Sequence, residues 1–331
     1  MLYIEQIRAQ AKKNPKRIIL PEHEDIRVLK AAEIIAKEGL AKVTLLGKKD
    51  NLTVFAKSNS INLSGVEIID PENFKDRDRI IDTFWQLRKH KGITPEKAKE
   101  AVLTNYVYYG AIMVRFGICD GFVAGASHTT PDVARAALYC LELDPVVRTM
   151  SGAFFMEVPN SPYGEKGAFI FADCGIMPEP SVNQLTGISI ASADLFKKLT
   201  GKTPYVALLS YSTKGSAEGP LVEKVQDALA KIKNARPDLL VDGELQVDSA
   251  LVPEVAKIKL KDSPVAGKAN VLIFPNLDSG NISYKLVQRL ANARAVGPLI
   301  QGATRPCSDL SRGCFVEDVV DAVAVTVVRS Q

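Results

Sequence analysis

The chain has 331 residues, 46% of them hydrophobic and 24% charged. This composition is typical of folded globular proteins and excludes disordered, collagen-like and coiled-coil classes. Its length fits about two domains of ordinary size. The 42 basic and 38 acidic residues leave a net charge of +4, too small a surplus for a dedicated nucleic-acid binder.

The first part of the chain alternates strand and helix patterns. Short β-branched runs predict strands at 17–20, 43–46, 66–69 and 121–124. Apolar residues at helical spacing predict a helix from Ile26 to a stop at Gly39, and a second at 77–90. Thr94-Pro95 and Thr130-Pro131 have the pattern of a helix cap followed by proline at the first helical position.

The middle of the chain begins with a different pattern. Strand-like runs at 152–158 and 168–172 flank the turn-rich segment 159–164, which predicts an antiparallel hairpin. Helices are then expected at 181–199, 220–234, 282–292 and 315–328, with strands at 205–210, 271–274 and 297–301. The sequence therefore predicts an α/β fold with mostly parallel sheets.

Four segments between strands and helices are rich in glycine and hydroxyl side chains. They are 125–130, 210–216, 276–281 and 309–314. Each precedes an expected helix, whose free N–H groups and dipole favour an anion. Turns that need glycine and helices that need caps would explain any one of these loops. The four together favour a phosphorylated ligand.

Familiar cofactor and metal motifs are absent from the sequence. It contains no GxGxxG and no GxxxxGK[ST] pattern. Three histidines and five scattered cysteines without a CxxC pair offer no ligand cluster. We therefore expect neither a metal ion nor a bound organic cofactor.

The segment 311–318 has the densest set of reactive side chains. Arg312, in a glycine-containing loop, offers the planar donors that grip phosphate, and Ser311 adds a hydroxyl. Asp318 follows in the first turn of the last expected helix. A purely structural role remains open for both charged residues: Asp318 as a carboxylate complementing the helix dipole, and Arg312 in a surface ion pair.

Several separate motifs, in order along nearly the whole chain, carry a resemblance to a known family. They are PEHEDIRVLKAA near the start, LRKHKGIT at 87–94, DGFVAGASHTTPDVARAAL at 120–138, FADCGIMPEPS at 171–181, YSTKGSA at 211–217, LQVDSALVP at 245–253, and AVGPLIQG followed by SDLSRGCFVEDVVDAVAVTVV near the end. In these segments the sequence closely resembles phosphate acetyltransferase (phosphotransacetylase).

The resemblance implies the reaction acetyl phosphate + coenzyme A ⇌ acetyl-CoA + phosphate, with coenzyme A as a substrate. It also implies a homodimer of chains with two α/β domains in an isocitrate-dehydrogenase-like arrangement, with the active site in the interdomain cleft. The domains would span 1–146 plus 298–331, and 147–297. We expect no nucleic-acid or membrane partner. No apolar run reaches the roughly 20 residues that cross a bilayer, and 1–13 has no signal-peptide core, so a cytoplasmic location is expected.

The resemblance also assigns roles to residues. The family's catalytic aspartate corresponds to Asp318, and its phosphate-binding serine and arginine to Ser311 and Arg312. Arg88 and Arg135 correspond to arginines that bind coenzyme A, although ordinary solvated or packing roles remain open for both. Further candidates for substrate binding in the glycine-rich loops are Ser127, His128, Thr129, Ser212, Thr213 and Lys214.

Direct transfer within a ternary complex is the simplest mechanism. Asp318 would take the thiol proton, and Arg312 with Ser311 would stabilise the oxyanion and the departing phosphate. A free Asp near ~3.9 and a thiol near ~8.5 make full proton transfer uphill by about 6 kcal/mol. Either desolvation raises the pKa of Asp318 or proton removal is concerted with attack. The rival is a covalent route through Cys314 or Cys174.

Two other functions stay open at this point. Phosphate butyryltransferase has the same fold and takes a longer acyl group. A non-catalytic acyl-CoA-sensing module would be a different class of protein. The intact set of Ser311, Arg312 and Asp318 argues against the sensing module.

Overall fold

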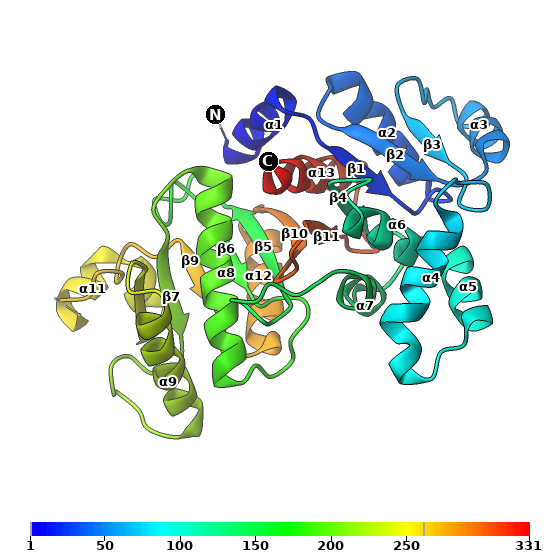
Figure 1. The fold of residues 1–331 in the computed structure, drawn as a ribbon. Coiled ribbons are helices and arrows are strands. Elements are labelled where there is room, and N and C mark those ends of the chain that lie inside the picture. Colours follow the sequence, from blue (N-terminus) through cyan, green and yellow to red (C-terminus); the bar gives the residue numbers. More distant parts are fainter. Residues whose placement is uncertain (1, 261) are drawn as a thin grey trace. The chain divides into compact units, whose positions relative to one another are not determined.

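The chain divides into two compact units in the computed structural model, which describes residues 2–260 and 262–331 (Figure 1). The first unit comprises residues 3–142 and 303–331, and the second comprises residues 143–302. Each unit is described by itself below. Within the described residues, no helix has both the length and the apolar character of a membrane span.

The first unit alternates strands with helices as the sequence predicts. Its elements are α1 (Tyr3–Lys13), β1 (Arg17–Leu20), α2 (Ile26–Glu38), β2 (Lys42–Leu46), α3 (Lys49–Ser58), β3 (Glu67–Ile69), α4 (Arg77–Arg88), the short 3-10 helix η1 (Lys89–Lys91), α5 (Pro95–Thr104), α6 (Tyr106–Arg115), β4 (Gly121–Ala124), α7 (Thr130–Cys140), β11 (Cys307–Asp309) and α13 (Val316–Ser330).

The strands of the first unit are parallel in all of their described pairs. The strand order is β3-β2-β1-β4-β11. The chain leaves β1 toward β2 on one side, and β4 lies on the other side. Strand order therefore reverses between β1 and β4, and open α/β sheets bind ligands outside the carboxyl ends of such a pair.

Local caps explain where several helices begin. Thr94 caps α5 with Pro95 at the first helical position, which confirms the prediction. For α7 the cap is Thr129, one residue before the expected Thr130, because Thr129 and Asp132 form a reciprocal capping box. Gly39 ends α2 with φ 68°, a left-handed conformation that glycine adopts without strain.

Helix α13 is the core helix of the first unit. Every residue from Val319 to Val328 is buried. It contacts α1, α2 and β4, elements far away in sequence (Figure 1). This burial explains why the segment 319–328 is mostly apolar and has Asp321 as its only charged residue, whose carboxylate pairs with Arg8 at 2.5 Å.

The second unit contains the predicted hairpin and further βα units. Its elements are β5 (Ser151–Glu157), β6 (Ala168–Ala172), α8 (Val182–Thr200), β7 (Tyr205–Leu209), α9 (Pro220–Ala235), β8 (Leu240–Leu245), α10 (Val247–Leu251), α11 (Pro253–Lys259), β9 (Val271–Ile273), α12 (Leu277–Leu290) and β10 (Arg294–Gln301).

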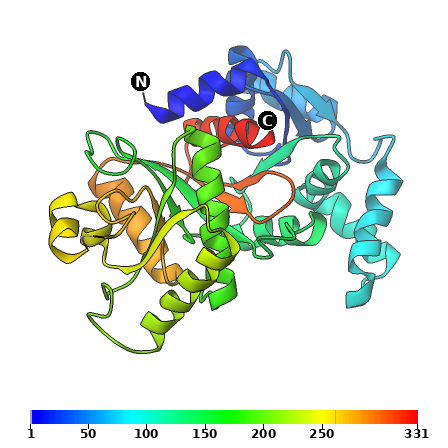
Figure 2. The same ribbon diagram turned by 60° about the vertical axis from the view of Figure 1, so that its left-hand side comes forward.

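The strands of the second unit pair in the order β10-β5-β6-β9-β7-β8, with mixed directions. Strand β5 is antiparallel to both β10 and β6, which confirms the hairpin, and the remaining described pairs are parallel. Helices α8 and α9 pack against each other (Figure 2). In the core of the second unit, the rings of Phe154 and Tyr284 stack with centroids 3.9 Å apart.

Several elements differ from the sequence-based expectation, and for three of them the local chemistry gives the reason. Helix α12 begins at Leu277, five residues earlier than expected, because the side chain of Asn276 accepts the Ser279 N–H and caps it. The segment 277–281 is therefore helix and not loop. Strands β8 and β11 were not predicted, since acidic residues interrupt their apolar pattern.

Candidate active site

Three loops of the first unit follow parallel neighbouring strands and so leave the sheet at the same edge. They follow β1, β4 and β11, which lie next to one another in the order β1-β4-β11. The loop after β1 contributes Glu22 and His23, the loop after β4 contributes residues 125–129, and the loop after β11 contributes Ser311 and Arg312.

The carboxylate of Glu22 fills the backbone cradle of the loop after β4. Its Oε2 accepts the N–H groups of Gly125 and Ala126, each at 2.8 Å. Its Oε1 accepts the N–H groups of Ser127 and His128, each at 2.9 Å. The Ser127 hydroxyl donates to the same oxygen at 3.0 Å. These amides, which the sequence suggested for a phosphate, therefore hold an internal carboxylate.

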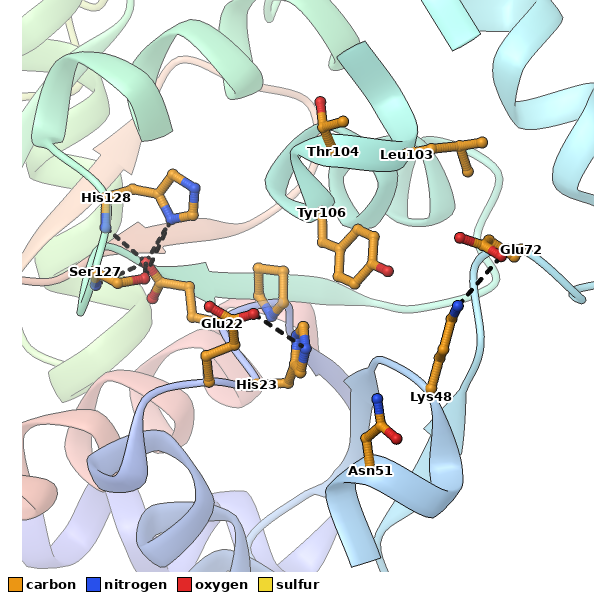
Figure 3. Close-up of a pocket in the computed structure, with 12 residues that line it drawn as sticks. Glu22, His23, Lys48, Asn51, Glu72, Leu103, Thr104, Tyr106, Ser127 and His128 are labelled. Carbon is orange, nitrogen blue, oxygen red and sulfur yellow. Dashed lines mark hydrogen bonds and ion pairs between the residues drawn. The ribbon is translucent and has the colours of Figure 1, made fainter. Parts of the chain in front are cut away.

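Glu22 also pairs with an imidazole. His128 Nδ1 lies 2.8 Å from Glu22 Oε1 (Figure 3). Burial raises the pKa of Glu22, but the His128 and backbone hydrogen bonds outweigh it, so the pKa is lowered overall. The bond to Glu22 in turn raises the pKa of His128 above its ordinary value, although burial opposes it.

The guanidinium of Arg27 connects two of the three loops. It donates to the carbonyl of Ala126 at 2.7 Å, to that of Arg312 at 2.8 Å and to that of Cys314 at 2.9 Å. Its position is fixed by Asp25, which accepts from Nη2 at 2.6 Å and from Nε at 3.0 Å. Arg27 thereby sets the backbone of the loop that presents Ser311 and Arg312.

The predicted catalytic group lies on the β11–α13 connection. Ser311 and Arg312 are exposed, and the guanidinium of Arg312 forms no hydrogen bond or ion pair within the described residues. Asp318 Oδ2 accepts the N–H of Phe315 at 2.7 Å, so this half-buried carboxylate caps the first turn of α13. Ser311 and Arg312 thus lie on the loop after β11 and Asp318 in the first turn of the helix that follows, with the Arg312 side chain open to a ligand.

A buried carboxylate precedes Ser311 by two residues. Asp309 ends β11, has no exposed surface, and neither carboxylate oxygen has a hydrogen-bond partner among the described residues. A Cβ on Gly125 would lie 2.1 Å from Asp309 Oδ1, so only glycine permits this approach. Burial, with the negative charge of Glu22 added, raises the pKa of Asp309 to about 7.

The two arginines expected at coenzyme A lie around a pair of tyrosines. The guanidinium carbon of Arg88 lies 3.5 Å from the centroid of the Tyr139 ring, and Tyr139 stacks on Tyr108 with centroids 6.4 Å apart. Arg135 is exposed and pairs with Asp132 at 2.9 Å, and its charge acts on Tyr108. Thr129 donates its hydroxyl to Asp132 at 2.6 Å and is thus engaged as the cap of α7.

The remaining predicted residues belong to the second unit. Ser212 has no exposed surface and donates to Glu244 at 3.0 Å. Thr213, 8% exposed, donates to Gln246 at 3.2 Å. Lys214 binds Asp242 at 2.5 Å and the carbonyl of Gly243 at 2.7 Å. Of these three residues, Ser212 and Thr213 are buried and Lys214 is exposed.

A polar pocket of about 490 Å³ opens in the first unit beside the Glu22–His128 pair. His128 and Ser127 line it on one side, and His23 and Tyr106 line it on another (Figure 3). The His23 and Tyr106 rings stack with centroids 5.4 Å apart. The pocket therefore offers imidazole groups and an aromatic face to a polar ligand.

The cysteines of the rival covalent route are poor nucleophiles in this fold. Cys314 and Cys174 are both buried. Burial raises the pKa of the Cys314 thiol to about 11 and that of Cys174 well above its ordinary value. Since the thiolate is the reactive form, this environment favours direct transfer over an acyl-cysteine intermediate.

Sequence reasoning missed the residues that organise these loops. Glu22, Arg27 and Asp309 were not singled out, although Glu22 and Arg27 both lie in the motif PEHEDIRVLKAA. An ionisable residue directly after a strand, within a segment shared with a family, was the available signal. Their partners lie about 100 or more residues away along the chain and could not be read from local pattern.

A free guanidinium and a hydroxyl on the loop after β11, with a carboxylate in the first turn of α13, form an arrangement suited to enzymes that act on anionic substrates. Residues 2–327 match the family described as phosphate acetyl/butaryl transferase, and the chain belongs to this family of transferases.

Individual relatives agree with this membership. The chain is 50% identical to the phosphate acetyltransferase of Thermoanaerobacterium thermosaccharolyticum over 331 residues, covering 100% of both chains. It is 49% identical to that of Acetivibrio thermocellus, covering 100% of this chain and 99% of the relative. A phosphotransacetylase structure from Streptococcus pyogenes has a TM-score of 0.92 at 37% identity, covering 99% of this chain and 98% of the other.

Proposed function

We propose that the chain transfers an acetyl group between acetyl phosphate and coenzyme A, in the reaction acetyl phosphate + CoA ⇌ acetyl-CoA + phosphate. The observation that carries this proposal is the full-length similarity, at 50% and 49% identity, to two phosphate acetyltransferases. The grouping of Ser311, Arg312 and Asp318 on one connection supports it.

In the proposed mechanism, acetyl phosphate and CoA are bound together and react directly. Asp318 accepts the thiol proton, the sulfur attacks the carbonyl carbon, and the bond from that carbon to the phosphate oxygen breaks. Arg312 and Ser311 stabilise the negative charge that develops on the carbonyl and on the departing phosphate. The free guanidinium of Arg312 supports this role, because it has no internal partner to give up within the described residues.

The proton transfer needs help that a capping carboxylate does not supply by itself. Oδ2 of Asp318 already accepts the Phe315 N–H, so Oδ1 is the oxygen we assign to the thiol. An ordinary carboxylate is a far weaker base than a thiolate. We therefore propose that proton removal accompanies the attack of sulfur, so that no free thiolate has to form first.

Binding of coenzyme A is assigned to the basic groups outside this loop. Arg88 and Arg135 would take its phosphates beside the Tyr108–Tyr139 pair, and Lys214 would contribute from the second unit. Ser127, His128, Thr129, Ser212 and Thr213 complete the proposed binding residues. Thr129 and Ser212 now donate to Asp132 and Glu244, so contact with a ligand would require these bonds to be shared or exchanged.

The wider setting is part of the same proposal. The two domains would have the isocitrate-dehydrogenase-like arrangement with the active site in the cleft between them, and two chains would form a homodimer. The enzyme would work in the cytoplasm with neither nucleic acid nor membrane as a partner. It would need no metal ion and no organic cofactor. Dialysis against EDTA should leave its activity unchanged, and a loss restored by one metal would overturn that point.

A thiol-dependent assay with acetyl, propionyl and butyryl phosphates tests the function. Acetyl phosphate should give the highest kcat/KM, with acyl-CoA formed in proportion to phosphate released. A clear preference for butyryl phosphate would move the chain to the butyryl side of its family. Absence of turnover with all three compounds would overturn the proposal and leave a non-catalytic acyl-CoA-binding role.

A further inference from the structure

The hydrogen bond between Glu22 and His128 fixes the tautomer of the imidazole. Glu22 accepts four backbone N–H bonds and its pKa is lowered, so its carboxylate is ionised and only accepts. The atom 2.8 Å away, His128 Nδ1, must therefore carry a hydrogen. In neutral His128 the other nitrogen, Nε2, is then a bare acceptor. Only the charged imidazolium has a hydrogen on Nε2 to donate.

Figure 3 shows where this second nitrogen lies. The ring nitrogen of His128 that is not bonded to Glu22 points away from that carboxylate, and the side chain, 30% exposed, lines the polar pocket. Glu22, by contrast, is 4% exposed as a residue and enclosed by the loop. The pair therefore has a buried anionic end and an accessible end whose hydrogen depends on protonation.

The charged groups around the pair favour the protonated imidazole. Glu22 and, through space, Asp132 of α7 raise the pKa of His128, and burial opposes them. The charges of Arg27 and Asp309 interact electrostatically with Glu22. His23, Glu24, Lys48 and Glu72 line the pocket, and Lys48 is paired with Glu72 at 3.5 Å.

We propose that Glu22 is a positioning residue for the transfer reaction, holding the His128 imidazolium so that its Nε2–H donates to a phosphoryl oxygen of a substrate. The proposal rests on the proposed function, because acetyl phosphate and coenzyme A are the phosphate-bearing substrates. His128 is the group that touches the substrate, and Glu22 acts only through it and through the loop 125–128. The loop amides, held by Glu22, do not bind the phosphate themselves.

This arrangement makes a directional prediction about pH. Below the pKa of His128 the donor is present, and the KM of the phosphate-bearing substrate is constant. Above it the Nε2 hydrogen is lost, and the KM should rise with pH toward a limit roughly 10- to 150-fold higher, the value of one charge-assisted hydrogen bond. A general base at the same position would instead need the neutral imidazole, and kcat would rise with pH.

The pKa of His128 can be measured directly, since the chain has only three histidines. NMR titration of the imidazole C–H signals, assigned with His23→Gln, His90→Gln and His128→Gln variants, should place the His128 pKa above the ordinary value of about 6.5. Glu22→Gln should lower it, while Glu22→Asp, which keeps the charge, should lower it less. An unchanged His128 pKa in a folded Glu22→Gln variant would overturn the proposal, whether or not the protein is active.

Steady-state kinetics from pH 6 to pH 9 give the functional test. In the wild type, one substrate should show a KM that rises as the pH passes the His128 pKa, and that substrate, acetyl phosphate or CoA, is the one that His128 contacts. If it is CoA, a comparison with dephospho-CoA shows whether the contact is with the 3′-phosphate. His128→Gln should remove the rise, and His90→Gln, on the exposed η1 segment, should retain it. If Glu22→Gln does not fold, the pH profiles of KM for the wild type and for His128→Gln test the proposal instead. A KM independent of pH, or a kcat that rises with the His128 pKa, would overturn the proposal.

Discussion

Two buried carboxylates in this protein are each held by four backbone amides, yet their pKa values move in opposite directions. Glu22 accepts from residues 125–128, and Asp173 accepts from Gly152, Gly175, Ile176 and Met177. The pKa of Glu22 is lowered because His128 adds a further bond, whereas burial raises the pKa of Asp173 in spite of its amides. A side chain that can carry positive charge therefore decides the balance.

The carboxylate of Asp318 is predicted to matter for turnover more than for binding. Asp318→Asn keeps the shape and can still accept the Phe315 N–H, but it cannot take a proton. We expect kcat to fall by ~10²–10⁴-fold while KM values stay within a few-fold. Glu317→Gln, one residue earlier on the same turn, is the matched control in the same assay. An Asp318→Asn variant with more than half the wild-type kcat would exclude Asp318 as the base.

Asp309 should make the stability of the protein depend on pH. Its pKa is raised from 3.8 to about 7 in the folded state, so its contribution is fully present below 3.8 and lost as the pH rises through 7. The full difference is on the order of 4 kcal/mol. Asp309→Asn does not titrate, and its melting temperature relative to wild type should therefore increase from pH 4 to pH 8.

Thermal unfolding at several pH values measures this difference. Asp50→Asn, an exposed carboxylate at the start of α3, should show no such trend. If the melting temperatures of Asp309→Asn and wild type differ by the same amount at pH 5 and pH 8, the pKa of Asp309 is not raised in the folded protein.

At the scale of elements, Arg27 connects the start of α2 to the β4–α7 and β11–α13 loops. Arg27→Lys keeps the charge but cannot reach the carbonyls of Ala126, Arg312 and Cys314 together. We expect a loss of about 2–4 kcal/mol in the free energy of unfolding, and a kcat lowered roughly 10- to 100-fold, because the loop that presents Arg312 loses its anchor.

Denaturant unfolding and steady-state kinetics check this expectation. Arg17→Lys is the control, because the Arg17 guanidinium donates to a single carbonyl, that of Ile118, in an exposed hydrogen bond. Wild-type stability and turnover in Arg27→Lys would show that the loops hold their conformation without this connection.

The two basic groups near Tyr139 yield a separate prediction, about coenzyme A. Arg135→Ala should raise the KM for CoA far more than that for acetyl phosphate, since its proposed partner is a remote CoA phosphate. Dephospho-CoA is the decisive comparison: wild type should discriminate against it, and Arg135→Ala should largely stop doing so. If both proteins discriminate equally against dephospho-CoA, Arg135 does not contact the 3′-phosphate, and its ion pair with Asp132 remains its structural role.

Local sequence predicted the elements whose signals are local. The caps at Thr94 and Ser181 and the turn between β5 and β6 depend on residues within a few positions. Strand β8 was missed because its buried residues include Asp242 and Glu244. Their partners, Lys214 and Gly215, lie 28 and 29 residues away along the chain. An acidic strand is only stable with partners that a local pattern does not contain.

The candidate site, like the fold, could be predicted only where the signal lies within a short stretch of sequence. The position of Ser311, Arg312 and Asp318 on one connection followed from eight consecutive residues. The loop 125–128 has the composition of an anion cradle, and it does hold an anion, but the anion is the Glu22 carboxylate, more than 100 residues earlier. The sequence indicated an anion at this loop, and only the three-dimensional structure shows that the anion held by its amides is Glu22 and not a phosphate.

At the scale of the whole molecule, helix α12 presents an apolar row that bears on assembly. Ile282, Leu286 and Leu290 lie four residues apart on one face of the helix and are 56%, 52% and 79% exposed. We expect this row to contribute to the proposed homodimer, because a second copy would remove it from water.

Sedimentation velocity measures the assembly. Wild type should sediment as a particle of about twice 35.9 kDa, and Leu286→Glu should shift it toward the single-chain mass. Ile258→Glu, at an 83% exposed position on α11, is the control and should leave the mass unchanged. A wild-type protein of single-chain mass, or a Leu286→Glu variant that still pairs, would contradict the expectation.

The interrupted first unit has a consequence for how the protein is made. Its sheet lacks β11 and its core lacks α13 until residues 303–331 have been synthesised, and 160 residues (302 − 142) separate these from the earlier part of the unit. At roughly 5–20 residues per second, the ribosome needs about 8–32 s to make that insertion. The earlier elements of the second unit can form during this interval, and its last strand, β10, is made at the end of it. The first unit stays incomplete until its last helix has been synthesised. Until then the strand edge of β4 and the apolar faces of α1 and α2 are uncovered.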